Sequence, residues 1–302
     1  MSSTKTLIFV VGPTAVGKTS VAIDLALEYK CEIISADSRQ FFKDIAIGTA
    51  KPSDQELAVI KHHFVDFLDL GESYSAGQFE KEAMSFLEGY FQENDICICV
   101  GGSGLYVNAL MFGLDDLPSS PSVRSEIIEL YEKEGLVALQ RKLEELDPEH
   151  YASMDAQNKQ RVMRALEVCM ASGVKYSELR SLSKKDRPFK SIVIGLNRDR
   201  EELYDRINKR VDLMLEEGLL EEVKSVYPRK SLNSLQTVGY KEFFNHFDGE
   251  YDKEEAIRLV KRNSRRFAKR QITWFNKYET IQWFKPSKKA AILKFVSLNR
   301  SK

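Results

Sequence analysis

The chain has 302 residues, of which 43% are hydrophobic and 30% charged, and its 45 basic and 45 acidic residues give a formal net charge of zero. This composition is typical of a globular protein with a sizeable core, so it excludes intrinsic disorder and fibrous repeats. The balanced charge excludes bulk electrostatic adhesion to nucleic acid or to anionic membranes, and any nucleic-acid site must come from locally clustered Lys and Arg.

Short apolar runs bounded by glycine or polar residues predict the strands of a sheet. They lie at Leu7–Val11, Glu32–Ser35, Phe64–Leu68, Ile96–Val100 and Ser191–Leu196. Apolar residues at helical spacing predict helices at Thr19–Tyr29 and Ala76–Phe91. Because strands and helices alternate, we expect an α/β fold with a doubly wound parallel sheet, which binds ligands at the carboxyl ends of its strands.

The pattern changes after Leu117. Two prolines at 118 and 121 interrupt the chain, and from Ser122 to about Ser181 only helical patterns occur. We therefore expect a helical insertion domain at 118–188, which follows a first core segment at 1–117. The remaining segment, 189–302, completes the core, is rich in helix, and ends in a candidate last strand at Ile281–Phe284.

The cysteines and the N-terminus give no sign of a metal centre or of export. Cys31, Cys97, Cys99 and Cys169 lack the two-residue spacing of redox and zinc motifs, and the four histidines are not spaced as metal ligands. We expect buried, reduced thiols at positions 97 and 99. The first apolar run is too short for a signal peptide or a membrane span, so a cytoplasmic protein is expected.

A phosphate-binding loop follows the first predicted strand. Residues 12–19 (GPTAVGKT) fit the pattern G-x-x-x-x-G-K-[ST], with an apolar strand before it and an amphipathic helix after it. Such a loop, here called the P-loop, predicts a P-loop NTPase-like core whose amides surround phosphate oxygens and whose Thr19 hydroxyl can bind Mg²⁺. The phosphate-binding residues are Gly12, Pro13, Thr14, Ala15, Val16, Gly17, Lys18 and Thr19. The loop alone does not distinguish a triphosphatase or kinase from a transferase that expels diphosphate.

Polar segments also follow the second and fourth predicted strands. The first contains Asp37, which could bind Mg²⁺ or accept a proton from an attacking nucleophile. The other is the glycine-rich turn Gly101–Tyr106 (GGSGLY), which could supply backbone amides and a hydroxyl or could be a structural turn. Both would lie at the edge of the sheet where the P-loop lies.

Seven segments, in this order, resemble those of the tRNA dimethylallyltransferases over nearly the whole chain. They are Gly12–Thr19, Ser35–Gln40 (SADSRQ), Gly48–Pro52 (GTAKP), Gly101–Tyr106, Asp155–Val168, Val238–Glu242 (VGYKE) and Ala268–Phe275 (AKRQITWF). The resemblance implies transfer of a dimethylallyl group from dimethylallyl diphosphate to N6 of adenine 37 in tRNA, next to the anticodon, with Mg²⁺ as cofactor. The chain stops without the cysteine- and histidine-bearing extension of eukaryotic members, so a bacterial-type enzyme is expected.

The resemblance also implies roles for residues. Lys18, Thr19 and Arg210 would stabilise the diphosphate leaving group, and Asp37 would be the general base. The family contacts the tRNA anticodon stem-loop through residues that correspond to Asp37, Ser38, Arg39, Gln40, Ser103, Arg124, Gln160, Arg161, Val162, Met163, Arg164, Gln236, Tyr240 and Lys241. Ser103 stands where the family usually has Thr, and Gln236 where some members have Arg. We expect a monomer that does not bind membranes.

The segment from Arg258 to Arg270 carries seven basic residues and no acidic one. Residues 258, 262, 265 and 269 recur at helical spacing and predict one basic stripe, with Leu259, Phe267 and Ile272 packed inward. The stripe is a candidate track for an RNA backbone, and a solvated helix face is the alternative.

Three other functions share some of these features. An adenylate isopentenyltransferase has a similar loop but prenylates free AMP, ADP or ATP, and a small-molecule kinase binds ATP in the same loop. A non-enzymatic RNA-binding module is the third. The basic stripe and the segment Gln160–Arg164 favour tRNA over a free nucleotide, and Lys18, Thr19 and Asp37 favour an enzyme.

Overall fold

The computed structural model describes residues 4–180 and 184–300. The chain divides into two compact units, a core unit formed by Met1–Phe112 and Asp186–Lys302 and a helical unit formed by Gly113–Lys185. The bounds expected for the insertion domain, 118 and 188, lie within a few residues of these. Ser181, where the predicted helical stretch ends, lies outside the described residues.

The core unit is built on a six-stranded parallel sheet with the strand order β3-β2-β4-β1-β5-β6. Val11 at the end of β1 lies opposite Gly101 of β4 and Gly195 of β5, so three strands end together at one edge. The strands are β1 (Thr6–Val11), β2 (Ile33–Ser35), β3 (His62–His63), β4 (Ile96–Gly101), β5 (Lys190–Leu196) and β6 (Gln282–Phe284). The predicted parallel sheet is confirmed, including the last strand.

One predicted strand is wrong. The apolar run Phe64–Leu68 is not extended, because Phe64 and Asp66 have φ angles of 61° and 59° in the left-handed region. The strand at this position is β3, two residues earlier in the chain. Leu68 forms only an isolated bridge to Phe42.

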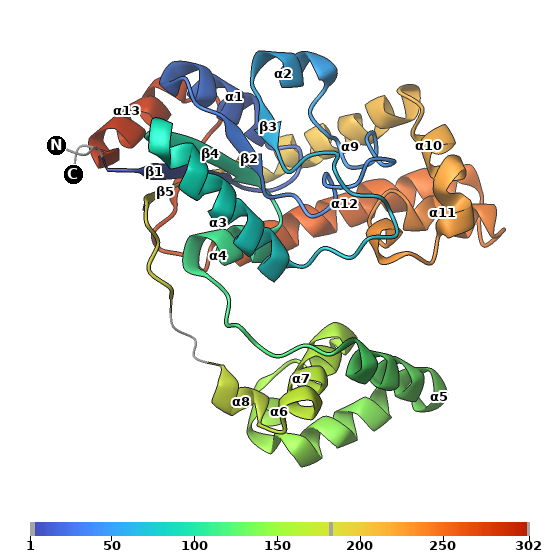
Figure 1. The fold of residues 1–302 in the computed structure, drawn as a ribbon. Helices are drawn as coiled ribbons and strands as arrows, with labels where there is room; N and C mark the ends of the chain where they lie inside the picture. The colour runs from blue at the N-terminus through green and yellow to red at the C-terminus, as the bar shows by residue number, and fades with distance from the viewer. Residues whose placement is uncertain (1–3, 181–183, 301–302) are drawn as a thin grey trace. The chain divides into compact units, whose positions relative to one another are not determined.

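Helices cover both faces of the sheet (Figure 1). Helices α1 (Lys18–Tyr29) and α13 (Lys289–Arg300) lie on one face, and α3 (Ala76–Glu93) and α4 (Gly104–Phe112) lie on the other. Alternate residues of β1 follow this division, since Ile8 packs with the first pair and Phe9 with the second. A strand buried on both faces therefore reads as one apolar run, as the sequence does.

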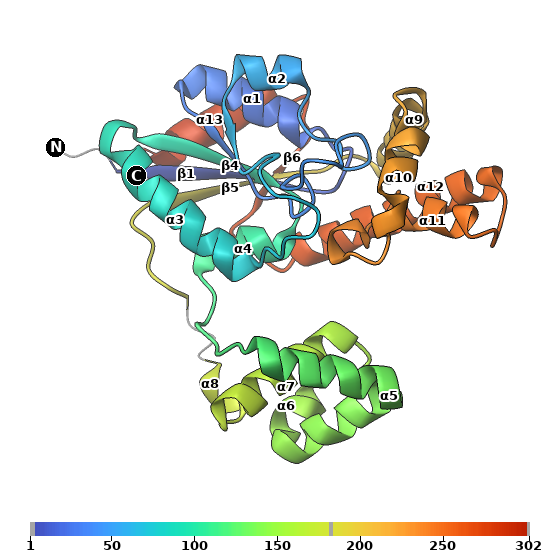
Figure 2. The same cartoon turned by 45° about the vertical axis from the view of Figure 1, so that its right-hand side comes forward.

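The C-terminal part of the core unit adds a group of helices beside the sheet (Figure 2). These are α9 (Arg200–Glu216), α10 (Leu219–Val226), α11 (Lys241–Phe247) and α12 (Lys253–Phe275). A short helix, α2 (Asp54–Val59), follows the Gly48–Pro52 segment. Within 4–180 and 184–300, no helix is long and apolar enough to cross a membrane.

The helical unit contains α5 (Pro121–Leu146), α6 (Pro148–Ser153), α7 (Lys159–Ser172) and α8 (Tyr176–Leu179). Helix α5 is kinked at Gly135, whose φ of 76° is not helical. Its two halves pack through Ile127 and Leu139 around α7, which contributes Val162 and Leu166. The prediction of helices alone is confirmed for the described part of this segment.

Glu222 of α10 anchors the Gly48–Pro52 segment. Its carboxylate accepts hydrogen bonds from the backbone amides of Ala46, Ile47 and Gly48 at 2.8–2.9 Å and from the Tyr240 hydroxyl at 2.5 Å. In Glu222→Gln, an NH₂ group replaces one carboxylate oxygen and faces N–H or O–H donors, with which it cannot form a hydrogen bond. We therefore expect the free energy of unfolding to fall by about 1–3 kcal/mol. Denaturant titration measures this. Glu221→Gln, on the exposed neighbour, is the matched control and should change it little.

Candidate active site

A cavity of about 890 Å³, here called the main cavity, lies where β1, β2 and β4 end. Its walls come from the P-loop, the turn after β2, the turn after β4, and helices α9 and α12. Thr14, Asp37, Ser103 and Arg210 all line it. The structure thus brings together the P-loop and the polar segments that follow the second and fourth strands.

The P-loop depends on glycine at its two turns. Gly12 has φ 147°, and a Cβ atom there would lie 2.5 Å from the Leu196 carbonyl oxygen. Gly17 adopts a left-handed conformation with φ 107° directly before α1, which begins at Lys18. The loop amides therefore lie at the N-terminus of a helix, where an anion is favoured.

Arginines fix the outer side of the P-loop. Arg198 donates through Nε to the Val16 carbonyl oxygen and Arg206 to that of Ala15, both at 2.9 Å. Arg210 of α9 donates to the Thr14 hydroxyl at 3.2 Å. Two carbonyl oxygens of the loop are therefore held by cationic side chains. Only Arg210 was assigned a role from the sequence; Arg198 and Arg206 were missed, since nothing in their local sequence marks them.

Lys18 lies beneath the loop and donates to the Pro13 carbonyl oxygen at 2.9 Å. Burial lowers its pKa from 10.5 to about 8; the Asp37 carboxylate opposes this shift, and Arg210 adds to it. Lys18 is therefore still a cation at neutral pH, in surroundings that strengthen its attraction for an anion.

Asp37 lies in the turn after β2, opposite the P-loop. Its Oδ1 accepts the Arg39 amide at 3.1 Å, which fixes the side chain at the cavity wall. The Ser103 hydroxyl accepts the Ser38 amide at 3.0 Å and donates to the Ser38 hydroxyl at 3.1 Å. Ser103 therefore connects the turn after β2 to the turn after β4. This contact needs only a hydroxyl, which serine and threonine both have.

Several residues predicted to touch RNA line the main cavity, namely Ser38, Arg39, Ser103, Gln236 and Lys241. Gln40 instead donates to the carbonyl oxygens of Thr49 and Ala50 and so holds the Gly48–Pro52 segment.

Three residues predicted to contact RNA have buried side chains. Tyr240 is 0% exposed and donates to Glu222, and Val162 and Met163 are 0% and 3% exposed in the core of the helical unit. Any contact of these residues with RNA must therefore come from the backbone, while the side chains support the surface from within. The sequence alone does not tell whether an apolar or aromatic residue inside a recognition motif contacts RNA or packs in the core.

The remaining predicted contacts lie in the helical unit. Arg124 donates to Gln160 at 3.0 Å, and both Arg124 and Arg164 lie within 4 Å of the buried Glu167 carboxylate. Arg161 is exposed. One carboxylate between two arginines leaves this surface with an excess of positive charge.

Helix α12 presents basic residues to the main cavity, and one of them, Arg262, belongs to the predicted stripe. Arg262, Arg266 and Arg270 line the cavity, four residues apart. Of the others, Arg258 is paired with Glu255 and Arg265 donates to Asn208. Three of the four residues of the predicted stripe, at positions 258, 265 and 269, therefore lie off the row that faces the cavity. Phe267, expected in the core, is 38% exposed and lines the cavity together with Leu259.

The residues of the P-loop fit a magnesium ion held jointly with substrate phosphates. Within the described residues, no group of three or more His, Cys, Asp or Glu side chains could bind a metal by itself. Mg²⁺ is commonly held by one or two protein oxygens plus phosphates and water. The half-buried Thr19 at the first turn of α1 has the hydroxyl for that role.

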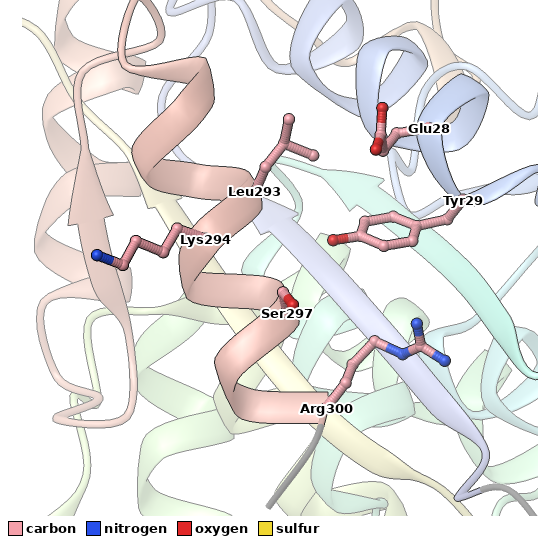
Figure 3. A pocket seen from close by; sticks show the side chains of 6 residues that line it. All are labelled: Glu28, Tyr29, Leu293, Lys294, Ser297 and Arg300. Atoms are coloured by element: carbon pink, nitrogen blue, oxygen red, sulfur yellow. The ribbon is translucent and has the colours of Figure 1, made fainter.

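A second cavity, of about 500 Å³, lies at the C-terminal end of α1, whereas the P-loop lies at the N-terminal end of that helix (Figure 3). It is formed by the end of α1 and by α13, and its lining residues are Glu28, Tyr29, Leu293, Lys294, Ser297 and Arg300. None of the predicted site residues lines it, so the chemistry belongs to the main cavity.

The sequence is similar to those of known proteins over nearly its whole length. Residues 40–278 match the family model described as IPP transferase. The chain is 50% identical over 287 residues to a tRNA dimethylallyltransferase of Flavobacterium johnsoniae, covering 93% of each chain. It is 51% identical over 279 residues to one of Christiangramia forsetii, covering 92% of each.

Solved structures give the same likeness. The tRNA isopentenylpyrophosphate transferase of Bacillus halodurans is 38% identical and has a TM-score of 0.73, with 98% of this chain and 97% of that one covered. A eukaryotic dimethylallyltransferase acting on tRNA is 30% identical with a TM-score of 0.76, covering 89% of this chain and 69% of that one.

Proposed function

The chain belongs to the IPP transferase family, and from that premise we propose that it transfers a dimethylallyl group from dimethylallyl diphosphate to N6 of adenine 37 in tRNA. One observation in the structure supports the proposal independently of the names of related proteins. A diphosphate-type loop, a carboxylate and three arginines of one helix line the same cavity. Arginines in a row along one helix are typical of a site for a polyanion such as RNA, so they favour tRNA over a free nucleotide as the acceptor.

The residues divide the reaction between them. The P-loop amides, Lys18 and Arg210 stabilise the charge that develops on the diphosphate as it leaves. The C1–oxygen bond of the donor breaks with its electron pair going to diphosphate, and N6 of adenine forms the new bond to C1. Asp37 accepts the proton that N6 releases. Adenine must leave its stack to reach this carboxylate, as in other enzymes that modify bases.

Mg²⁺, held by the Thr19 hydroxyl and by the donor's phosphates, would add positive charge on the leaving group. The tRNA anticodon stem-loop is the proposed partner. Ser38, Arg39, Gln236 and Lys241 would contact it from the core unit, and Arg124, Gln160, Arg161 and Arg164 from the helical unit. The expected monomeric state and cytoplasmic location remain predictions.

The proposal is tested with purified protein, Mg²⁺ and radiolabelled dimethylallyl diphosphate. We expect label in a tRNA whose anticodon loop reads A36-A37-A38, and none when A37 is replaced by G. Label in free AMP would identify an adenylate isopentenyltransferase instead. ATP turnover without transfer would identify a kinase.

The arginines of α12 give a prediction about tRNA binding. Arg266→Ala removes an exposed cation from the cavity lining, so tRNA affinity should fall at low salt and the slope of log K against log salt should decrease by about 1. Filter binding over a salt series measures both. Arg258→Ala, on the same helix but paired with Glu255, is the matched control. Equal losses in the two variants would place the RNA elsewhere.

A further inference from the structure

Gln271 is a buried polar residue of α12 for which the reaction above has no role. It is 6% exposed and lies at the main cavity. Its Oε1 accepts the Thr14 amide at 2.8 Å, and its Nε2 donates to the Gly102 carbonyl oxygen at 3.0 Å. One side chain thus joins the P-loop to the turn after β4, which are 88 residues apart in the chain.

Only one orientation of this amide satisfies its neighbours. A backbone N–H must face the oxygen, and a carbonyl must face the NH₂ group, so a flipped amide would lose both bonds. The fit is also tight, because a Cβ atom at Gly102 would lie 2.3 Å from Nε2 and 3.4 Å from the Lys18 Nζ. Gln271, Gly102 and Lys18 therefore occupy one packed cluster below the P-loop.

The helix that carries Gln271 also carries the cavity arginines. Arg270 precedes it directly, and Arg266 lies four residues before Arg270, just over one turn away, and also lines the cavity. The P-loop contact is therefore made by the element that presents cations to the other substrate. A displacement of α12 cannot leave the Thr14 amide or the Gly102 carbonyl unaffected, since both would lose a buried partner.

We propose that Gln271 is a positioning residue for the diphosphate: it sets the P-loop against the Gly102 turn and makes the loop's geometry depend on α12. The inference rests on the proposed function for the identity of the donor. Gln271 acts on the diphosphate through Thr14 and Lys18, and it touches no reacting atom itself.

The test compares Gln271→Met, which keeps the side-chain length and removes both hydrogen bonds, with the wild-type protein. We expect inorganic diphosphate with Mg²⁺, measured by calorimetry, to bind about tenfold more weakly, and KM for dimethylallyl diphosphate to rise to a similar extent. KM for tRNA should stay within about twofold. Lys269→Met, on an exposed residue of the same helix, is the matched control and should change neither.

Gly102→Ala reaches the same contact from the other side, since its methyl group displaces Nε2, and should reproduce the weaker diphosphate binding if Gln271→Met does not fold. Wild-type diphosphate affinity in a folded variant overturns the proposal, as does an equal rise of both KM values, which a purely structural role would give. If the wild-type protein transfers no dimethylallyl group yet the variant still loses diphosphate affinity, the proposed function fails and the positioning role stands.

Discussion

Asp37→Asn is expected to slow transfer of the dimethylallyl group by roughly 10²–10⁴-fold, the usual loss when a general base is removed. Asparagine keeps an oxygen that can accept the Arg39 amide, so the turn after β2 should keep its conformation. What it loses is the ability to take the N6 proton. Single-turnover transfer to tRNA, with donor and enzyme in excess, measures the chemical step directly.

Binding separates this role from simple contact. If Asp37 acts as the base, Asp37→Asn should bind tRNA and dimethylallyl diphosphate within a few-fold of the wild-type protein. Asp54→Asn, on an exposed carboxylate of α2 that does not line the main cavity, is the matched control and should change neither the rate nor the binding. Nearly full activity with tRNA binding lost would limit Asp37 to a contact.

Lys18→Met should lower kcat/KM for dimethylallyl diphosphate by roughly 10²–10³-fold, because it removes a preorganised donor from the developing charge on the diphosphate. The position is nearly filled by the methionine side chain, so the loop should not collapse. Lys18→Arg retains a cation but not its compact shape, and it should recover only part of the loss.

The lowered pKa of Lys18 adds a pH dependence. The free enzyme has the ammonium form below a pKa of about 8 and loses it above. The value of kcat/KM for the donor, which reports the free enzyme, should therefore fall as pH rises through 8. Bound diphosphate favours the charged form of Lys18, so kcat should stay constant up to a higher pH than kcat/KM does. Lys18→Arg should abolish this limb, and an unchanged limb would assign it to another group.

Much of this molecule is predictable from its sequence. The apolar runs located β1, β2, β4 and β5, because strands buried on both faces leave a continuous signal, and the edge strand β6 was found from its aromatic residues. The motif GPTAVGKT located the P-loop, since this spacing of glycines and a lysine between a strand and a helix is typical of phosphate binding. β3 was missed because its two residues are too short for a pattern, and the nearby run Phe64–Leu68 is apolar but bent by two left-handed residues.

The rest of the site depends on contacts between segments distant in the chain. Glu222 reaches Gly48, Gln271 reaches Thr14, and Arg198 reaches Val16, each over more than 170 residues. No local pattern encodes such pairs. The row of α12 arginines that faces the cavity was also predicted only in part, because seven basic residues in thirteen positions fit several helix faces. Only the acidic partners Glu255 and Asp212 select among them.

The arginines that hold the P-loop carbonyls also bear on how turnover ends. Arg198 and Arg206 bind carbonyl oxygens of the loop, which an anion does not use, so we expect departure of the prenyl group to leave these hydrogen bonds in place and the product diphosphate to keep the contacts of the donor. Release then competes with chemistry for control of the rate. Inorganic diphosphate becomes a competitive inhibitor, and an enzyme that hydrolyses it would pull the modification forward by mass action.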